Sequence, residues 1–301
     1  MGQKTRAMFQ SRGHEMGIER TRLGAAIFAS AVFLSGCEAM SPGKPTLDGE
    51  MDVIEATELT ELMLNFREPD EAAAYFQGKL NSDPDNVEYM RGLAISLTRG
   101  GRNSQAALAY KRRIDSGKAT PEDQLLYAEA LLKGGDIDGA KAELDRIPPT
   151  LETYKRYLLE AIVADNRKDW STADSFYSTA RGLTARPAPV LNNWGMSKMA
   201  RGDLTGAANL FQEAITFDPK MFTAKNNLVN ARGQQRNYQL PVIPMDETEE
   251  AQLLYNLGII AVRQCDVSVA KGLFELAVDT HPEHFPEAVQ AQTALATPGG
   301  C

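Results

Sequence analysis

The strongest constraint on the fold is a residue pattern that recurs about every 34 positions along the chain. Two copies of the pattern have identical spacing. The first copy consists of Trp194, Gly195, Ala207, Phe211, Ala214 and Pro219, and the second consists of Leu257, Gly258, Ala270, Phe274, Ala277 and Pro282. Repeats with periods of about 20 to 50 residues form arrays, because one unit cannot bury its apolar face alone and is stable only when stacked on its neighbours. The sequence therefore predicts a repeat array through most of the chain.

The pattern resembles the tetratricopeptide repeat, an antiparallel helix pair with small residues at two crossing points and an aromatic residue between them. The resemblance implies an all-α fold, a right-handed superhelical solenoid of helix pairs with a C-terminal capping helix. We expect the solenoid at 53–298, with repeats near 53–86, 87–120, 121–153, 154–187, 188–221, a degenerate 222–250, and 251–284, followed by a cap at 285–297.

The sixth repeat departs from the pattern, because Pro241 and Pro244 fall where its second helix should run. Proline removes a backbone donor and clashes with the preceding turn of a helix. We therefore expect extended chain over residues 236–244. Two interpretations stay open: a deletion that the solenoid tolerates, or an irregular apolar segment that serves as a contact site.

The pattern of residues at the N-terminus indicates a targeting segment. Residues 23–36 carry no charge and follow several basic residues, but fourteen residues are too few for a spanning helix, which needs about 20. The stretch Leu34–Cys37 resembles the bacterial lipobox, in which the cysteine is acylated and becomes the new N-terminus. We therefore expect a signal peptide at 1–36, lipidation of Cys37 and an acylated tether at 37–52. Glu38 stands where aspartate is an inner-membrane retention signal in Gram-negative lipoproteins, which implies a periplasm-facing outer-membrane lipoprotein.

Composition and motifs argue against several function classes. The net charge is −8, and the basic clusters that nucleic-acid binding requires are missing, so no nucleic-acid partner is expected. Three cysteines and three histidines cannot build a zinc ribbon, and Pro282 between His281 and His284 favours a turn over a metal site. No phosphate-binding loop or catalytic triad stands out. We expect no enzyme activity, no cofactor and no metal.

The first helices of the repeats are expected to line one concave face, where a residue that recurs at one repeat position forms a ladder. Asn193, Asn227 and Asn256 recur at the sixth position. Amides offer both a donor and an acceptor, which suits the backbone of an extended peptide. We expect a peptide-binding groove that also includes Asn192, Asn226, Asn230, Met196 and Tyr255. The alternative is that asparagine occupies the sixth position for geometric reasons alone.

Cys265 and Cys301 remain as an even pair once Cys37 is acylated, in a compartment where disulfides form. A capping helix that runs beside the last repeat, followed by a glycine-containing tail, would bring the two sulfur atoms within bridging distance. Two readings stay open: a disulfide between them, or two free thiols with a frayed tail.

The chain as a whole, from the lipobox through the repeats to Ala277–Phe285, resembles the tetratricopeptide-repeat lipoproteins of Flp (Tad) pilus assembly, the TadD family. The resemblance implies a pilotin-like assembly factor, anchored by acyl chains, whose partner is the pilus secretin or another pilus component. Two alternatives remain: an adaptor for cell-wall enzymes or outer-membrane protein assembly, and an enzyme hidden in the irregular segment.

Overall fold

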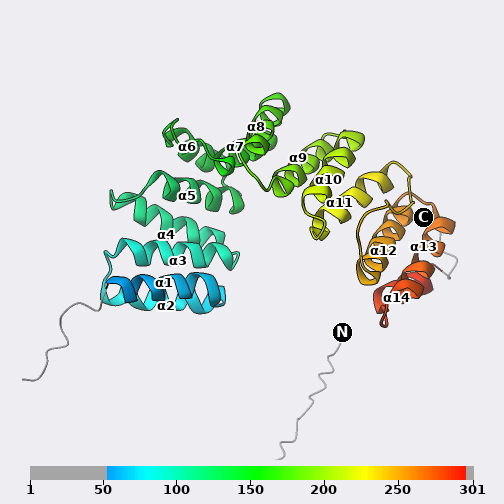
Figure 1. Cartoon of the computed structure of the whole chain (residues 1–301), viewed down its shortest axis with the longest axis horizontal. Helices are drawn as coiled ribbons and strands as arrows, with labels where there is room; N and C mark the ends of the chain where they lie inside the picture. Colours follow the sequence, from blue (N-terminus) through cyan, green and yellow to red (C-terminus); the bar gives the residue numbers. More distant parts are fainter. Residues whose placement is uncertain (1–52, 296–301) are drawn as a thin grey trace, which may run out of the picture. The chain divides into compact units, whose positions relative to one another are not determined.

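The computed structural model describes residues 53–295, and within this range the chain forms fourteen α-helices and no strand (Figure 1). The predicted signal peptide, the tether with Cys37, and Cys301 lie outside the described residues. The helices are α1 Val53–Phe66, α2 Pro69–Ser82, α3 Val87–Arg99, α4 Asn103–Asp115, α5 Pro121–Lys133, α6 Ile137–Arg146, α7 Tyr154–Asn166, α8 Trp170–Gly182, α9 Ala188–Ala200, α10 Leu204–Phe217, α11 Phe222–Gln234, α12 Glu247–Arg263, α13 Val267–Thr280 and α14 Pro286–Ala294.

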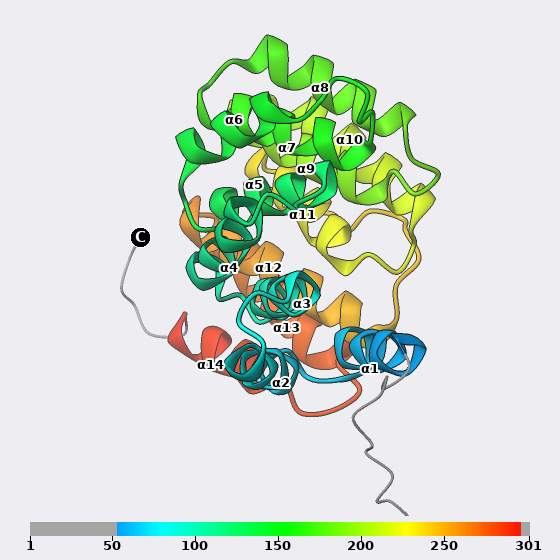
Figure 2. The same cartoon turned by 90° about the vertical axis from the view of Figure 1, so that its left-hand side faces the viewer.

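Each helix packs on the next helix in the chain, so contacts are local along the whole array (Figures 1 and 2). The first helices of the pairs are α1, α3, α5, α7, α9, α11 and α12. The last of them begins at Glu247, one turn before the repeat start expected at residue 251. The predicted all-α solenoid is confirmed, and α14 lies against α13 as its terminal cap, with Ala288 fully buried.

Two of the crossing points within the array pair a glycine with an aromatic ring. A Cβ atom placed on Gly195 would lie 2.5 Å from the Phe211 ring, closer than real Cβ atoms approach other atoms. Gly258 faces Phe274 in the same way, again at 2.5 Å. Glycine is therefore required at these points, because any side chain would push the two helices apart.

The turns between paired helices share one backbone conformation. One residue has positive φ in each of the turns that follow α3, α5, α7, α9, α11 and α12: Gly101, Gly135, Lys168, Gly202, Arg236 and Cys265. The next residue donates its backbone N–H to a carbonyl five residues earlier, as Asp169 does to Ala164 and Asp203 does to Lys198. This is the Schellman ending of a helix, which favours glycine because other residues are strained there.

Replacing Lys168 with glycine is expected to raise the free energy of unfolding by about 1 kcal/mol. Lys168 has a φ of 59°, a left-handed backbone conformation that is strained for lysine and unstrained for glycine. The comparison is Lys168→Ala, which removes the same side chain but keeps the strain. Urea denaturation should place the glycine variant above both the alanine variant and the natural chain. Equal midpoints for the two variants would show that the turn is not strained.

The sixth repeat has one helix, α11, and no helix between Gln234 and Glu247. Its two prolines account for the missing helix. Ile243 enters the core beside α10 and α11, and Tyr238 packs toward α12 and α13. The Tyr238 hydroxyl donates to Gln264 at 2.6 Å, and the Arg236 guanidinium binds the Asp266 carboxylate at 2.7 Å. Residues 235–246 therefore take the place of a second helix by covering both neighbouring cores.

Candidate functional site

The asparagines of the first helices bond to one another across neighbouring repeats. Asn227 Nδ2 on α11 donates to Asn192 Oδ1 on α9 at 2.9 Å, and Asn256 Nδ2 on α12 donates to Asn226 Oδ1 on α11 at 2.7 Å. In each pair, an amide at the sixth repeat position meets one at the fifth position of the preceding repeat. All four side chains are half-buried. The structure thus brings these four predicted residues together as two pairs.

Other amides extend this surface. Gln234 Nε2 donates to Asn230 Oδ1 at 2.9 Å, and Gln252 Nε2 donates to Asn256 Oδ1 at 3.1 Å. We call the surface formed by these amides the amide face; it consists of Asn192, Asn226, Asn227, Asn230, Gln234, Gln252 and Asn256. It carries no charged side chain of its own. Because each amide keeps a free donor or acceptor after pairing, the face can still bond a peptide backbone.

Asn193 and Met196 lie apart from the pairs, at a hollow between α7 and α9. Asn193 has no hydrogen-bond partner among residues 53–295, because the preceding first helix carries Leu158 where an asparagine would complete a third pair. Met196 is 41% exposed. These two residues of the predicted groove therefore line a hollow beside the amide face.

Tyr255 differs from its expected role. Its ring packs between Phe274 and Phe285, with centroid distances of 5.6 and 5.4 Å. These contacts join α12 to α13 and to the start of the terminal cap. Tyr255 therefore contributes to the core at this end of the array. Its ring does not form an open pocket for a peptide.

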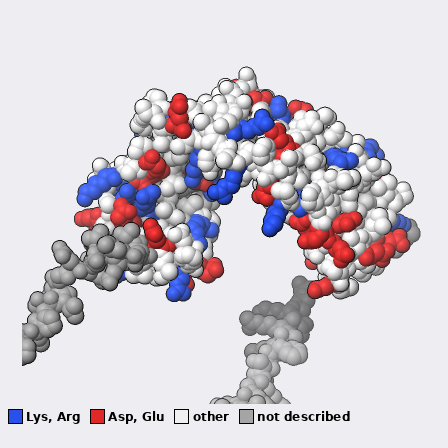
Figure 3. Space-filling view, in the orientation of Figure 1, with Lys and Arg blue, Asp and Glu red and all other residues white. Residues whose placement is uncertain are grey.

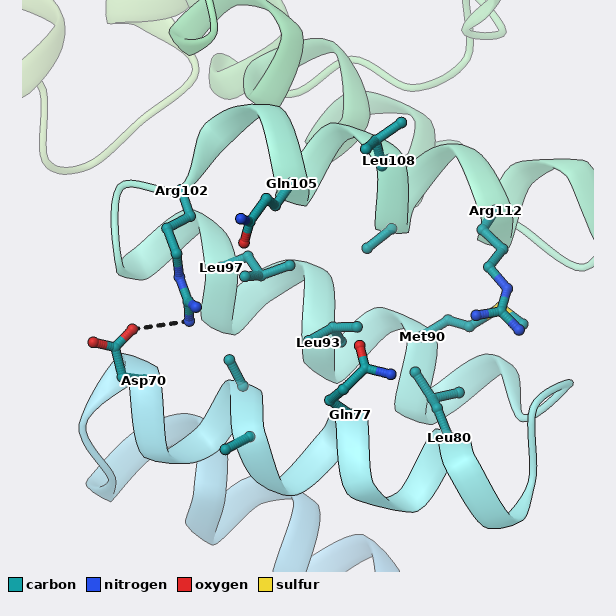
Figure 4. A pocket seen from close by; sticks show the side chains of 13 residues that line it. Asp70, Gln77, Leu80, Met90, Leu93, Leu97, Arg102, Gln105, Leu108 and Arg112 are labelled. Atoms are coloured by element: carbon teal, nitrogen blue, oxygen red, sulfur yellow. Dashed lines mark ion pairs between the residues drawn. The ribbon is translucent and has the colours of Figure 1, made fainter.

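A second hollow, which the sequence analysis missed, lies over α3 between α2 and α4 (Figure 4). Its volume is about 460 Å³, and Leu93 and Leu97 point into it from α3. Leu108 on α4 stands at the rim and is 69% exposed. An ion pair at 2.9 Å between Arg102 and Asp70 closes one end. The sequence feature that could have indicated this hollow is Leu108, an apolar residue on the solvent side of the second helix of its repeat.

Cys265 and His281, the remaining candidate residues that the structure describes, lie in turns. Cys265 is a free, exposed thiol in the turn between α12 and α13, and its predicted partner Cys301 lies outside the described residues. His281 Nδ1 accepts the backbone N–H of Glu283 at 3.1 Å, which is typical of a turn. Among the described residues, no cluster of three His, Cys, Asp or Glu side chains could hold a metal ion.

Charge is distributed without a continuous basic area on the visible side of the molecule (Figure 3). Acidic side chains gather over α12 to α14, while basic and acidic residues alternate elsewhere (Figure 3). Within residues 53–295, no helix is both long and apolar enough to cross a membrane. Both observations concern the folded repeats.

Comparison with known proteins identifies the repeat type. The tetratricopeptide-repeat family matches residues 64–119. A chain of the APC/C hetero-tetramer Cut9-Hcn1 is similar with a TM-score of 0.54 and 14% identity, over 81% of this chain and 48% of that one. A tetratricopeptide repeat protein from Parabacteroides merdae ATCC 43184 is similar with a TM-score of 0.53 and 11% identity, over 81% of this chain and 98% of that one.

These similarities concern the fold, because sequence identity is low throughout. The chain spans about half the length of the Cut9-Hcn1 relative. No curated protein matches it. The repeat pattern, the helix pairs, the family match over residues 64–119 and the structural neighbours agree on one conclusion. The described residues form an all-α solenoid of tetratricopeptide-repeat type.

Proposed function

We propose that this solenoid is an outer-membrane-anchored, protein-binding scaffold with a pilotin-like role in assembling the Flp (Tad) pilus secretion system. The observation that carries the binding function is the uncharged amide face on α9, α11 and α12. The anchoring and the pilus role rest on the sequence: the lipobox-like Leu34–Cys37 and the resemblance of the repeats to TadD lipoproteins.

The chemistry of the amide face suits an extended segment of a partner protein. Side-chain amides bond backbone N–H and C=O groups without regard to the partner's sequence, so they supply affinity along its length. Met196 and the half-buried Met199 add apolar contacts that adapt to different side chains. A secretin segment that is extended before assembly would fit such a surface.

The anchor is tested by Cys37→Ser. The variant should lose metabolic acyl labelling and outer-membrane fractionation while keeping the melting temperature of the natural protein, because Cys37 precedes the first described helix. The matched control is Cys265→Ser, which removes an exposed thiol from the folded repeats and should leave labelling intact. Labelling that survives the loss of Cys37 would overturn the lipoprotein assignment.

The partner is tested by capture from envelope extracts with the mature protein as bait. We expect the pilus secretin, and we expect the double variant Asn227→Ala, Asn256→Ala, which removes one amide from each pair of the amide face, to retain less of it. Asn209→Ala is the control, since Asn209 is an exposed asparagine on the second helix α10. Recovery of wall synthases or hydrolases in place of a secretin would favour the adaptor role and contradict the pilotin role. Undiminished capture by the double variant would remove this face from the proposal.

A further inference from the structure

The hollow beside Asn193 contains a carboxylate that is held in a fixed position. The space between α7 and α9 has a volume of about 380 Å³ and is lined by Ile162, Asp165, Asn166, Trp170, Tyr177, Asn193, Met196, Ser197 and Ala200. Asp165 accepts hydrogen bonds from Tyr177 Oη at 2.7 Å and from Ser197 Oγ at 2.6 Å. Each hydroxyl binds a different carboxylate oxygen, so the group cannot rotate freely.

Both hydroxyl donors are part of the core. Tyr177 is 1% exposed and Ser197 is 5% exposed, while Asp165 itself is half-buried and faces the hollow. Burial, together with the hydrogen bond to Asp165, raises the pKa of Tyr177 well above its ordinary value. Tyr177 therefore stays a neutral donor to the Asp165 carboxylate. Two acceptor positions on the carboxylate remain open.

The nearest cations on α9 are committed to a different carboxylate. Lys198 Nζ lies 3.1 Å from Asp174, and the Arg201 guanidinium also binds Asp174. Burial raises the pKa of Asp174, but hydrogen bonds from Arg201, Trp194 and Lys198 outweigh this effect, and the pKa is lowered. Among residues 53–295, Asp165 has no ion-pair partner. Its negative charge is thus oriented into the hollow and left without a counter-ion.

We infer that this hollow is a pocket for a lysine or arginine side chain of the bound protein segment. The head group would bind the open oxygens of Asp165 in a charge-assisted hydrogen bond, and an arginine could use both oxygens. The apolar walls formed by Ile162, Met196 and Ala200 suit the methylene stem of such a side chain. Asn193, at the rim, has a free amide for the backbone of the same residue.

This inference rests on the proposed peptide-binding function and adds a sequence preference to it. The amide face alone would accept many neutral segments. A single charged pocket at one end fixes which residue of the segment lies between α7 and α9, and therefore sets the register of the rest. The partner segment is expected to carry one basic residue within a largely uncharged, extended stretch.

The test uses the mature protein and a panel of fluorescent decapeptides of serine, threonine and valine that differ at one central position. That position is arginine, lysine, glutamine or glutamate. We expect the arginine and lysine peptides to bind about tenfold more tightly than the glutamine peptide, with the preference falling as salt is raised. Asp165→Asn should abolish the preference for arginine and lysine over glutamine.

Two further variants keep the result interpretable if Asp165→Asn unfolds. Met196→Lys introduces a competing cation at an exposed position of the rim, and it should remove the preference for basic peptides. Asp138→Asn removes an equal charge from a side chain that is 91% exposed on α6, and it should leave the preference intact. Peptides that bind without a basic preference, or a preference that survives Met196→Lys, would overturn the pocket alone. Failure of every peptide to bind would overturn the proposed peptide-binding function and this pocket with it.

Discussion

Replacing Phe211 with alanine is expected to lower the free energy of unfolding by about 3 to 5 kcal/mol, the cost of removing a fully buried aromatic ring. Phe211 has no exposed surface and fills the space against Gly195 where α9 and α10 cross. The cavity could shrink only by moving the two helices together. In a solenoid, the loss also weakens the interfaces with adjacent repeats, so the unfolding transition should broaden.

The control for this substitution is Phe217→Ala on the same helix. Phe217 is 53% exposed, so its removal should cost well under about 1 kcal/mol. Chemical denaturation of both variants, with circular dichroism at the helical band, measures the difference. If Phe211→Ala unfolds at the same denaturant concentration as Phe217→Ala, the assignment of Phe211 to the crossing point is wrong.

Replacing Asp123 with alanine is expected to destabilise the chain by about 3 to 5 kcal/mol, because it leaves the buried Arg113 guanidinium without its nearest carboxylate, with only the exposed Glu88 at 3.7 Å. Arg113 Nε lies 2.7 Å from Asp123 Oδ2, and the two side chains are 3% and 0% exposed. The same carboxylate accepts the backbone N–H of Thr120 at 2.9 Å and so caps α5. One side chain therefore joins α4 to α5 and also begins a helix.

A second substitution separates the charge from the cap. Adding Arg113→Met to Asp123→Ala removes the buried cation, and the double variant should recover part of the loss. The remainder reflects the cap, worth about 1 kcal/mol. Asp115→Ala is the exposed comparison, since Asp115 pairs with Lys111 at 2.6 Å on the surface and should cost less than about 1 kcal/mol. A double variant less stable than Asp123→Ala would contradict this account of the pair.

The fold was predictable because the repeat imposes the same local contacts many times. Small residues such as Gly195 and Ala207 and aromatic residues such as Phe211 mark where helices cross, and two prolines mark where a helix is missing. These features depend on residues close in sequence or at one fixed period. The start of α12 at Glu247 was not predictable from the period, because the missing helix changes the spacing there.

The site was less predictable, because its contacts join residues at different repeat positions. The sequence analysis aligned Asn193, Asn227 and Asn256 as one ladder, whereas the structure bonds Asn227 and Asn256 to asparagines one position earlier in the preceding repeat. Whether Asn193 has a partner depends on Leu158, 35 residues away. Asp165 drew no attention, because its two hydroxyl partners lie on two other helices, α8 and α9.

The asparagine pairs also link ligand binding to the geometry of the array. Each pair is a bond between two consecutive repeats, so it helps set the angle at which one repeat follows the next. A peptide group that takes over one of these amides exchanges a bond within the protein for a bond to the ligand, and frees that joint to change its angle. Occupancy of the amide face would then act on the same bonds that join α11 to α9 and to α12.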